Sequence, residues 1–167
     1  SVLVVGGAAA SIGLYAVAAA RALGAGDIAY LDHAPERLAI AERLGARVVE
    51  GPYRPQRTTY AITVDASADV RGLDAAVRST EPGGVCTSVG IYFAPTTRFP
   101  LLAAFMTGIE LRTGRVCSRA MLPRVIELIS AGRLVPSAVT PHIVAWADAP
   151  AAFRAEATKV IVVRDQM

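Results

Sequence analysis

The chain has 167 residues, 53% hydrophobic and 19% charged, so it is long and apolar enough to bury the core of one domain. This composition excludes a disordered chain, and the apolar run over residues 14–23 contains Arg21 and is too short to span a bilayer. The net charge of +3 comes from sixteen scattered arginines and one lysine, without interleaved aromatic residues, which argues against a nucleic-acid partner.

Apolar runs alternate with stretches of helical period along the whole chain. In chain order the pattern predicts a strand over residues 2–5, a helix over 11–23, a strand over 27–31, a helix over 35–44, strands over 47–49 and 60–65, a helix over 73–77, strands over 85–89 and 109–112, helices over 122–131 and 149–157, and a strand over 160–163. Gly24, Gly45 and Gly132 end helices, and residues 81–84 form a turn.

Strands that alternate with helices of this length indicate a parallel sheet with helices on both faces. Right-handed crossovers leave few topologies, and we expect the doubly wound, six-stranded sheet of the Rossmann type, formed by residues 1–167 as one domain.

The first chemical signal is the small-residue turn between the first strand and the first helix. The free N–H groups and the positive dipole end of that helix favour a diphosphate, and Gly13 would let the helix lie close to the strand. The turn departs from the minimal glycine pattern, because Ala8 and Ala10 occupy its first two glycine positions. A tight connection without a ligand is the alternative.

The second signal is Asp32 at the end of the second strand, 19 residues after Gly13. Its carboxylate would accept hydrogen bonds from an adenosine ribose and repel the extra phosphate of NADP, which favours NAD. The alternative is a helix cap ahead of Pro35. Arg37 on the next helix either covers the adenosine or is a solvated surface residue.

The two cysteines carry no metal signal. Cys86 and Cys117 lie far apart without Cys-x-x-Cys or Cys/His spacing, so no zinc site or disulfide is expected in this chain.

Many segments together resemble the coenzyme domain of zinc-type medium-chain dehydrogenases, the alcohol dehydrogenase-like family. The resemblance lies in residues 2–7, 11–17, 21–25, 31–38, 41–46, 64–67, 81–84, 88–90, 111–119, 127–134, 149–153 and 159–161. It covers nearly the whole chain in the right order.

The resemblance implies roles for individual residues toward NAD(H). Ser11, Ile12 and Gly13 would meet the diphosphate, and Asp32 the adenosine ribose. Residues implied elsewhere along the cofactor are Ala66 and Ser67 near the adenine side or the nicotinamide ribose, the backbone at Val89, Gly90, Ile91 and Thr113 at the nicotinamide, and Lys159 at the diphosphate. The segment 109–116 resembles the edge strand through which two such domains form a homodimer.

The resemblance also implies what this sequence lacks. The family's N-terminal GroES-like domain, which carries the zinc ligands and most of the pocket for an alcohol or carbonyl substrate, is not found in these residues. No residue here is therefore expected to be catalytic or to bind a metal, and zinc is expected only in that other domain.

Three alternatives remain for the function. A zinc-free quinone or enoyl reductase shares this domain but usually prefers NADP, a methyltransferase has a similar turn and acid, and a non-catalytic nucleotide-binding or dimerisation module would have lost its chemistry. Asp32 favours the zinc branch over the reductases.

Without a signal peptide or membrane segment, a cytoplasmic location is expected.

Overall fold

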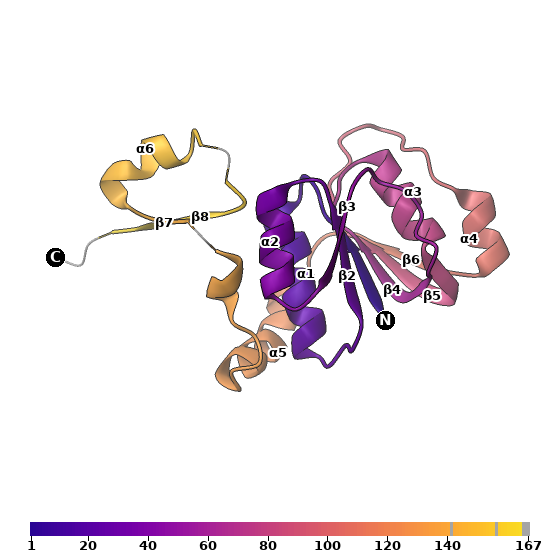
Figure 1. Ribbon diagram of the computed structural model, residues 1–167, viewed down its shortest axis with the longest axis horizontal. Coiled ribbons are helices and arrows are strands. Elements are labelled where there is room, and N and C mark those ends of the chain that lie inside the picture. The colour runs from indigo at the N-terminus through magenta and orange to yellow at the C-terminus, as the bar shows by residue number, and fades with distance from the viewer. Residues whose placement is uncertain (141, 156, 165–167) are drawn as a thin grey trace.

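A six-stranded parallel sheet forms the centre of the computed structural model, which describes residues 1–140, 142–155 and 157–164 (Figure 1). Its strand order is β3-β2-β1-β4-β5-β6, with every neighbouring pair parallel. The strands are β1 (Val2–Val5), β2 (Ile28–Asp32), β3 (Arg47–Glu50), β4 (Tyr60–Asp65), β5 (Thr80–Ser88) and β6 (Glu110–Thr113). This confirms the predicted sheet. Its winding reverses between β1 and β4, where ligands of such folds bind.

Helices cover both faces of the sheet because side chains alternate along its strands. On β1, Val2 and Val4 belong to the apolar cluster under α1 (Ala10–Ala22) and α2 (Pro35–Arg43). Leu3 and Val5 belong to the opposite cluster, under α3 (Val70–Arg78), beside which lies α4 (Leu101–Thr107).

The last third of the chain adds a separate lobe. Its elements are α5 (Ser118–Ser130), a 3-10 turn η1 (Pro136–Val139), β7 (His142–Ala145), a second 3-10 turn η2 (Trp146–Asp148), α6 (Ala149–Ala152) and β8 (Val160–Val163). β7 and β8 form a two-stranded parallel sheet away from the main one (Figure 1). Leu128, Leu134 and Val139 pack into the cluster under α1.

Several elements differ from the sequence prediction. The helix α4 was not predicted, because its sequence LLAAFMT is apolar nearly all round and has no helical face. β7 was missed as well. The predicted helix over 149–157 is only the four-residue α6, and the strand over 160–163 pairs with β7 outside the main sheet.

The middle of the chain follows the prediction with shifted boundaries. α3 begins earlier than expected, at Val70, because the Asp69 side chain accepts a hydrogen bond from the Arg71 N–H and caps the helix. The predicted turn over residues 81–84 lies inside β5. There the pairing jumps from Tyr60 with Thr80 to Ile62 with Val85, so the four residues bulge out of register.

Candidate functional site

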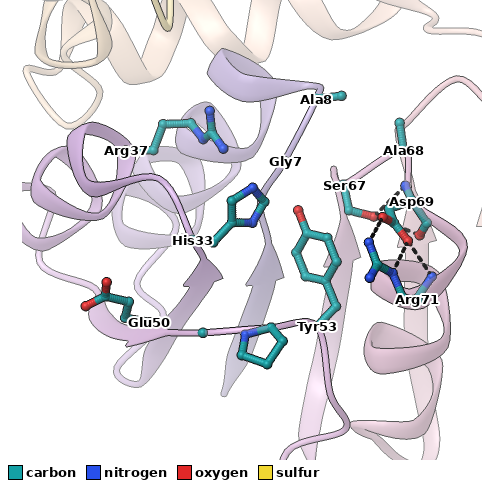
Figure 2. A pocket seen from close by; sticks show the side chains of 12 residues that line it. Gly7, Ala8, His33, Arg37, Glu50, Tyr53, Ser67, Ala68, Asp69 and Arg71 are labelled. Carbon is teal, nitrogen blue, oxygen red and sulfur yellow. Dashed lines mark hydrogen bonds and ion pairs between the residues drawn. The ribbon is translucent and has the colours of Figure 1, made fainter.

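A pocket of about 860 Å³ lies where the carboxyl ends of the central strands meet (Figure 2). Four loops contribute to it: the turns after β1, β2 and β4, and the segment after β3. Its lining includes Gly7, Ala8, His33, Arg37, Glu50, Tyr53, Ser67, Ala68, Asp69 and Arg71. The pocket is therefore at the position in the sheet where the sequence predicted a ligand.

The turn after β1 leads directly into α1. Gly7 has a φ of 150°, and a Cβ there would lie 2.7 Å from the Cα of Ser67, so only glycine fits. The Ala8 and Ala9 N–H groups donate to the carbonyls of Ser67 and Ala66. Among the described residues the N–H groups of Ala10 and Ser11 have no acceptor, which leaves two donors at the helix N-terminus.

Two residues in the first turn of α1 differ in their surroundings. Gly13 is buried, and a Cβ on it would lie 3.2 Å from the Cβ of Ala66, so a side chain would push α1 away from β4. Ile12, the preceding residue, is half exposed. The structure therefore brings Ser11, Ile12, Gly13 and Ala66 together.

Asp32 is completely buried at the end of β2, and its acceptor positions are filled. Arg37 donates to it twice, from Nε at 2.7 Å and from Nη2 at 2.8 Å. The Tyr30 hydroxyl donates at 2.8 Å, and the N–H groups of His33 and Ala34 donate at 2.7 and 3.0 Å. Burial alone would raise the pKa of Asp32, but these hydrogen bonds, with that of Arg37 the strongest, lower it below its usual value of 3.8.

This geometry differs from the expectation that the Asp32 carboxylate faces a ligand directly. Arg37 lines the pocket, whereas Asp32 does not. The sequence identified both residues as candidates, but it did not indicate that they would bind each other.

The turn after β4 is organised by a second buried carboxylate, Asp65. It accepts hydrogen bonds from the N–H and hydroxyl of Ser67, from the Ser88 hydroxyl at 2.7 Å and from the Tyr92 hydroxyl at 2.7 Å. Its backbone carbonyl accepts the N–H of Val89 at 2.8 Å. Asp65 thus ties the turn after β4 to the segment after β5. Burial, followed by the bond to Asp65, raises the pKa of Tyr92.

An apolar pocket of about 280 Å³ lies beside the larger one. It is lined by Ala8, Ala9, Ile12, Ala68, Val89, Ile91 and Phe93. Gly90 belongs to the same segment, and a Cβ on it would lie 2.9 Å from the N of Ala68. The structure therefore places Val89, Gly90 and Ile91 close to Ile12 and to the turn after β4.

Two predicted residues lie elsewhere. Thr113 ends β6, pairs with Ser88 across the sheet and is exposed. Lys159 donates a hydrogen bond to the Tyr15 hydroxyl at 3.1 Å, and its Nζ lies 4.7 Å from the centre of the Tyr15 ring. Tyr15 lies on α1, one helical turn beyond Ser11. Neither residue lines either of the two pockets described above.

Sequence reasoning missed Tyr53, which lies inside the larger pocket. Its hydroxyl donates to the Gly6 carbonyl at 2.9 Å, and its ring meets His33 edge-on at 5.6 Å (Figure 2). Burial and then the nearby Asp32 raise the pKa of Tyr53 to about 12. The loop that carries it, residues 51–59, joins β3 to β4 without a helix, and nothing local in the sequence indicates where its tyrosine points.

In the part of the chain that the structure describes, no three His, Cys, Asp or Glu side chains gather closely enough to hold a metal ion. No helix in the described ranges has the length and apolar character needed to cross a membrane.

Comparison with known proteins relates this geometry to one family. The family model described as zinc-binding dehydrogenase matches residues 11–131. An alcohol dehydrogenase of Cupriavidus necator is 33% identical in an alignment of length 146 that covers 78% of this chain and 39% of that protein.

Solved structures have the same fold. The alcohol dehydrogenase TADH of Thermus sp. ATN1 aligns with a TM-score of 0.86 and 30% identity, over 98% of this chain and 52% of that one. A zinc-binding dehydrogenase of Sinorhizobium meliloti, solved with NADP bound, aligns with a TM-score of 0.82 and 16% identity, over 98% and 52% of the two chains, and so supports the fold alone. The chain spans about two fifths to one half of the length of these relatives.

Proposed function

The chain belongs to the zinc-binding dehydrogenase family, and from that premise we propose that it is the NAD(H)-binding domain of an alcohol dehydrogenase-like oxidoreductase. In the whole protein a nicotinamide cofactor would exchange a hydride with an alcohol or carbonyl substrate. The chain described here supplies residues that bind and orient the cofactor.

The observation that carries this proposal is the pair of adjoining pockets at the turn after β1. The larger has charged and aromatic walls, including His33, Arg37 and Arg71, and the smaller is apolar. Ala8 and Ala68 line both, so the two pockets form one continuous track. A dinucleotide has matching parts, with a nucleoside at each end and a diphosphate between them.

The fit of each part follows from the groups that are present. The free N–H groups of Ala10 and Ser11 at the N-terminus of α1 suit the diphosphate. The adenosine half suits the pocket beside Arg37 and Ser67, and the nicotinamide suits the apolar pocket with Ile12 and the backbone of Val89, Gly90 and Ile91. Asp32 would favour NAD over NADP. Thr113 and Lys159 are proposed to approach the cofactor from the ends of β6 and β8.

A second domain would complete the enzyme. The relatives are about twice as long as this chain, and we propose that a GroES-like domain supplies zinc and the substrate pocket. The lobe after β6 supports this proposal, because its apolar side chains are largely uncovered, for example Ile143 on β7, Trp146 and Phe153. A two-stranded parallel sheet is also too small to be stable alone, so β7 and β8 would extend a sheet of that domain.

We also propose that two copies pair through β6. Its outer edge has no partner strand among the described residues, and Leu111 is exposed on it. Beside it, α4 exposes Leu101 and Phe105, which line an apolar hollow of about 460 Å³ together with Leu111. An open strand edge next to apolar side chains suits pairing with an identical edge.

The location proposed for the protein is the cytoplasm.

The experiment that tests the cofactor assignment is calorimetric titration of the folded chain with NADH. We expect binding that weakens about tenfold or more in Asp32→Ala, corresponding to about 1.4 kcal/mol. Asp74→Ala, which removes an exposed carboxylate from α3, is the control and should bind as the wild type does. Absence of NADH binding by a folded wild-type sample would refute the assignment for this chain.

A further inference from the structure

The inference concerns the buried carboxylate of Asp65, and it rests on the function proposed above. Asp65 ends β4, is completely inaccessible to solvent and lines neither of the two adjoining pockets. Burial of a carboxylate is costly unless hydrogen-bond donors replace the water that it loses. The groups that donate to Asp65 therefore show which parts of the chain it holds together.

The two carboxylate oxygens of Asp65 bind two different loops. Oδ1 accepts the N–H of Ser67 at 3.0 Å and the hydroxyl of the same residue, and Ser67 lines the larger pocket. Oδ2 accepts the hydroxyls of Ser88 and Tyr92, both at 2.7 Å. Ser88 ends β5, and Tyr92 lies directly after residues 89–91, which border the apolar pocket. Each oxygen thus lies behind the wall of a different pocket.

The segment over residues 89–100 has few other polar attachments. It contains no helix or strand, and in the described structure the N–H groups over residues 91–99 donate to no backbone carbonyl. The N–H groups of Val89 and Gly90 donate to the Asp65 carbonyl at 2.8 and 3.3 Å. The Tyr92 hydroxyl donates to the Asp65 carboxylate and, at 3.2 Å, to the Asp69 carbonyl. The hydrogen bonds that hold this segment in place therefore converge on Asp65.

The turn after β4 is attached more firmly than the segment after β5. Its carbonyls at Ala66 and Ser67 accept the N–H groups of Ala9 and Ala8, in addition to the bonds that Ser67 makes to Asp65. Removal of the Tyr92 hydroxyl would leave all of these bonds intact. It would loosen only the segment that borders the apolar pocket.

The two loops also touch where the pockets join. Ala68 lines both pockets, and a Cβ on Gly90 would lie 2.9 Å from the N of Ala68. Because the loops are in such close contact, a shift of the segment after β5 changes the shape of the apolar pocket directly.

We propose that Asp65 is a positioning residue that holds the segment after β5, through the Tyr92 hydroxyl, where the nicotinamide half of the cofactor binds. Asp65 does not touch the ligand. The adenosine diphosphate half binds in the larger pocket, whose walls do not depend on the Tyr92 hydroxyl. Loss of that hydroxyl therefore weakens binding of a ligand that carries a nicotinamide and spares one that lacks it.

The test compares NADH with ADP-ribose, which lacks the nicotinamide, by calorimetry on the full chain below its unfolding transition. For each protein the readout is the dissociation constant of ADP-ribose divided by that of NADH. In wild type we expect this ratio to be at least about ten. In Tyr92→Phe, which keeps the ring and its packing, we expect the ratio to fall at least about fivefold while the dissociation constant of ADP-ribose stays within about twofold.

Further variants separate positioning from stability. Asp65→Asn keeps the shape of the side chain and should lower the ratio as Tyr92→Phe does. The double variant should lower it no more than about twofold further, because the same contact is removed in each. Tyr60→Phe is the matched control, since it removes a buried hydroxyl that accepts a hydrogen bond from Arg47 at 2.9 Å at the opposite end of β4. It should leave the ratio within about twofold of wild type.

Three results would overturn the inference and leave the function standing. They are equally tight binding of the two ligands by wild type, an unchanged ratio in Tyr92→Phe, and an equal fall of the ratio in Tyr60→Phe, each in a sample that circular dichroism shows to be folded. If Asp65→Asn does not fold, Tyr92→Phe decides alone. If folded wild type binds neither ligand, the dinucleotide function is wrong, and this inference is wrong with it.

Discussion

Replacing Gly6 by alanine should be among the most damaging small substitutions in this chain. Gly6 lies between β1 and α1 with an ordinary φ, so alanine adds no backbone strain there. The added Cβ would lie 2.3 Å from both the Asp32 Oδ2 and the Tyr30 hydroxyl, more than 1 Å inside ordinary contact. Both neighbours are fully buried, and Asp32 is held by five hydrogen bonds, so neither can move without losing interactions.

The magnitude follows from the two costs that this overlap imposes. Overpacking in a core costs about 1–3 kcal/mol, and a lost hydrogen bond to a charged group costs about 1.5–3 kcal/mol. Together they predict a loss of about 2.5–6 kcal/mol in the free energy of unfolding. For a chain of this size, each kcal/mol lowers Tm by about 2–4 °C, so Gly6→Ala should unfold at least about 5 °C below wild type.

Circular dichroism during thermal and urea unfolding measures this difference. The matched control is Gly26→Ala, because a Cβ at Gly26 meets nothing within 4 Å and its φ suits alanine. That variant should be neutral or slightly stabilised, by up to about 1 kcal/mol. If Gly6→Ala unfolds within 2 °C of Gly26→Ala, the tight contact described between the turn and Asp32 is wrong.

Three further predictions concern the same region. Hydrogen bonds lower the pKa of Asp32 in the folded state, so the contribution of Asp32 to stability is present above the unfolded pKa of 3.8 and is lost as the pH falls through the folded pKa. The difference in Tm between wild type and Asp32→Asn should therefore shrink from pH 7 to pH 3. A constant difference would contradict this. Ala68 has a φ of 53°, a left-handed conformation that costs about 1–2 kcal/mol for a residue with a Cβ. Ala68→Gly should therefore keep or raise Tm, whereas the control Ala39→Gly, on the exposed side of α2, should lose about 1 kcal/mol of stability. Equal losses in the two variants would count against backbone strain at Ala68. Tyr92→Phe removes a donor to the Asp65 carboxylate and should cost about 2 kcal/mol in urea unfolding, more than the roughly 1 kcal/mol of Tyr53→Phe, which removes a donor to a neutral carbonyl; the reverse order would refute the importance given to Asp65.

The fold could be predicted from the sequence where a strand is buried on both faces. Val2–Val5 is buried throughout and Ile28–Asp32 likewise, and such strands appear as continuous apolar runs. In the lobe after β6, α5 and β8 were predicted, but β7 was missed and α6 is shorter than expected. β7 and α6 are largely exposed in this chain, so their sequences lack the pattern that burial of one face imposes.

At the candidate site, sequence spacing identified residues but not their contacts. Asp32 and Arg37 were both named, yet only the angle at which α2 leaves β2 makes them partners. Tyr53 reaches Gly6 across 47 residues, and Asp65 joins two loops through hydroxyls that sequence periodicity does not reveal. Long-range polar contacts of this kind depend on tertiary packing.

The packing of Leu128, Leu134 and Val139 against α1 affects the order in which parts of the chain fold during synthesis. All six strands of the main sheet lie within the first 113 residues, so they can pair as the chain emerges from the ribosome. The surface over α1 nevertheless stays open to water until the following 26 residues are made. A chain ended after Thr113 should therefore assemble the sheet but bind a hydrophobic dye such as ANS, and equal dye binding by the full chain would show that this cover does not close.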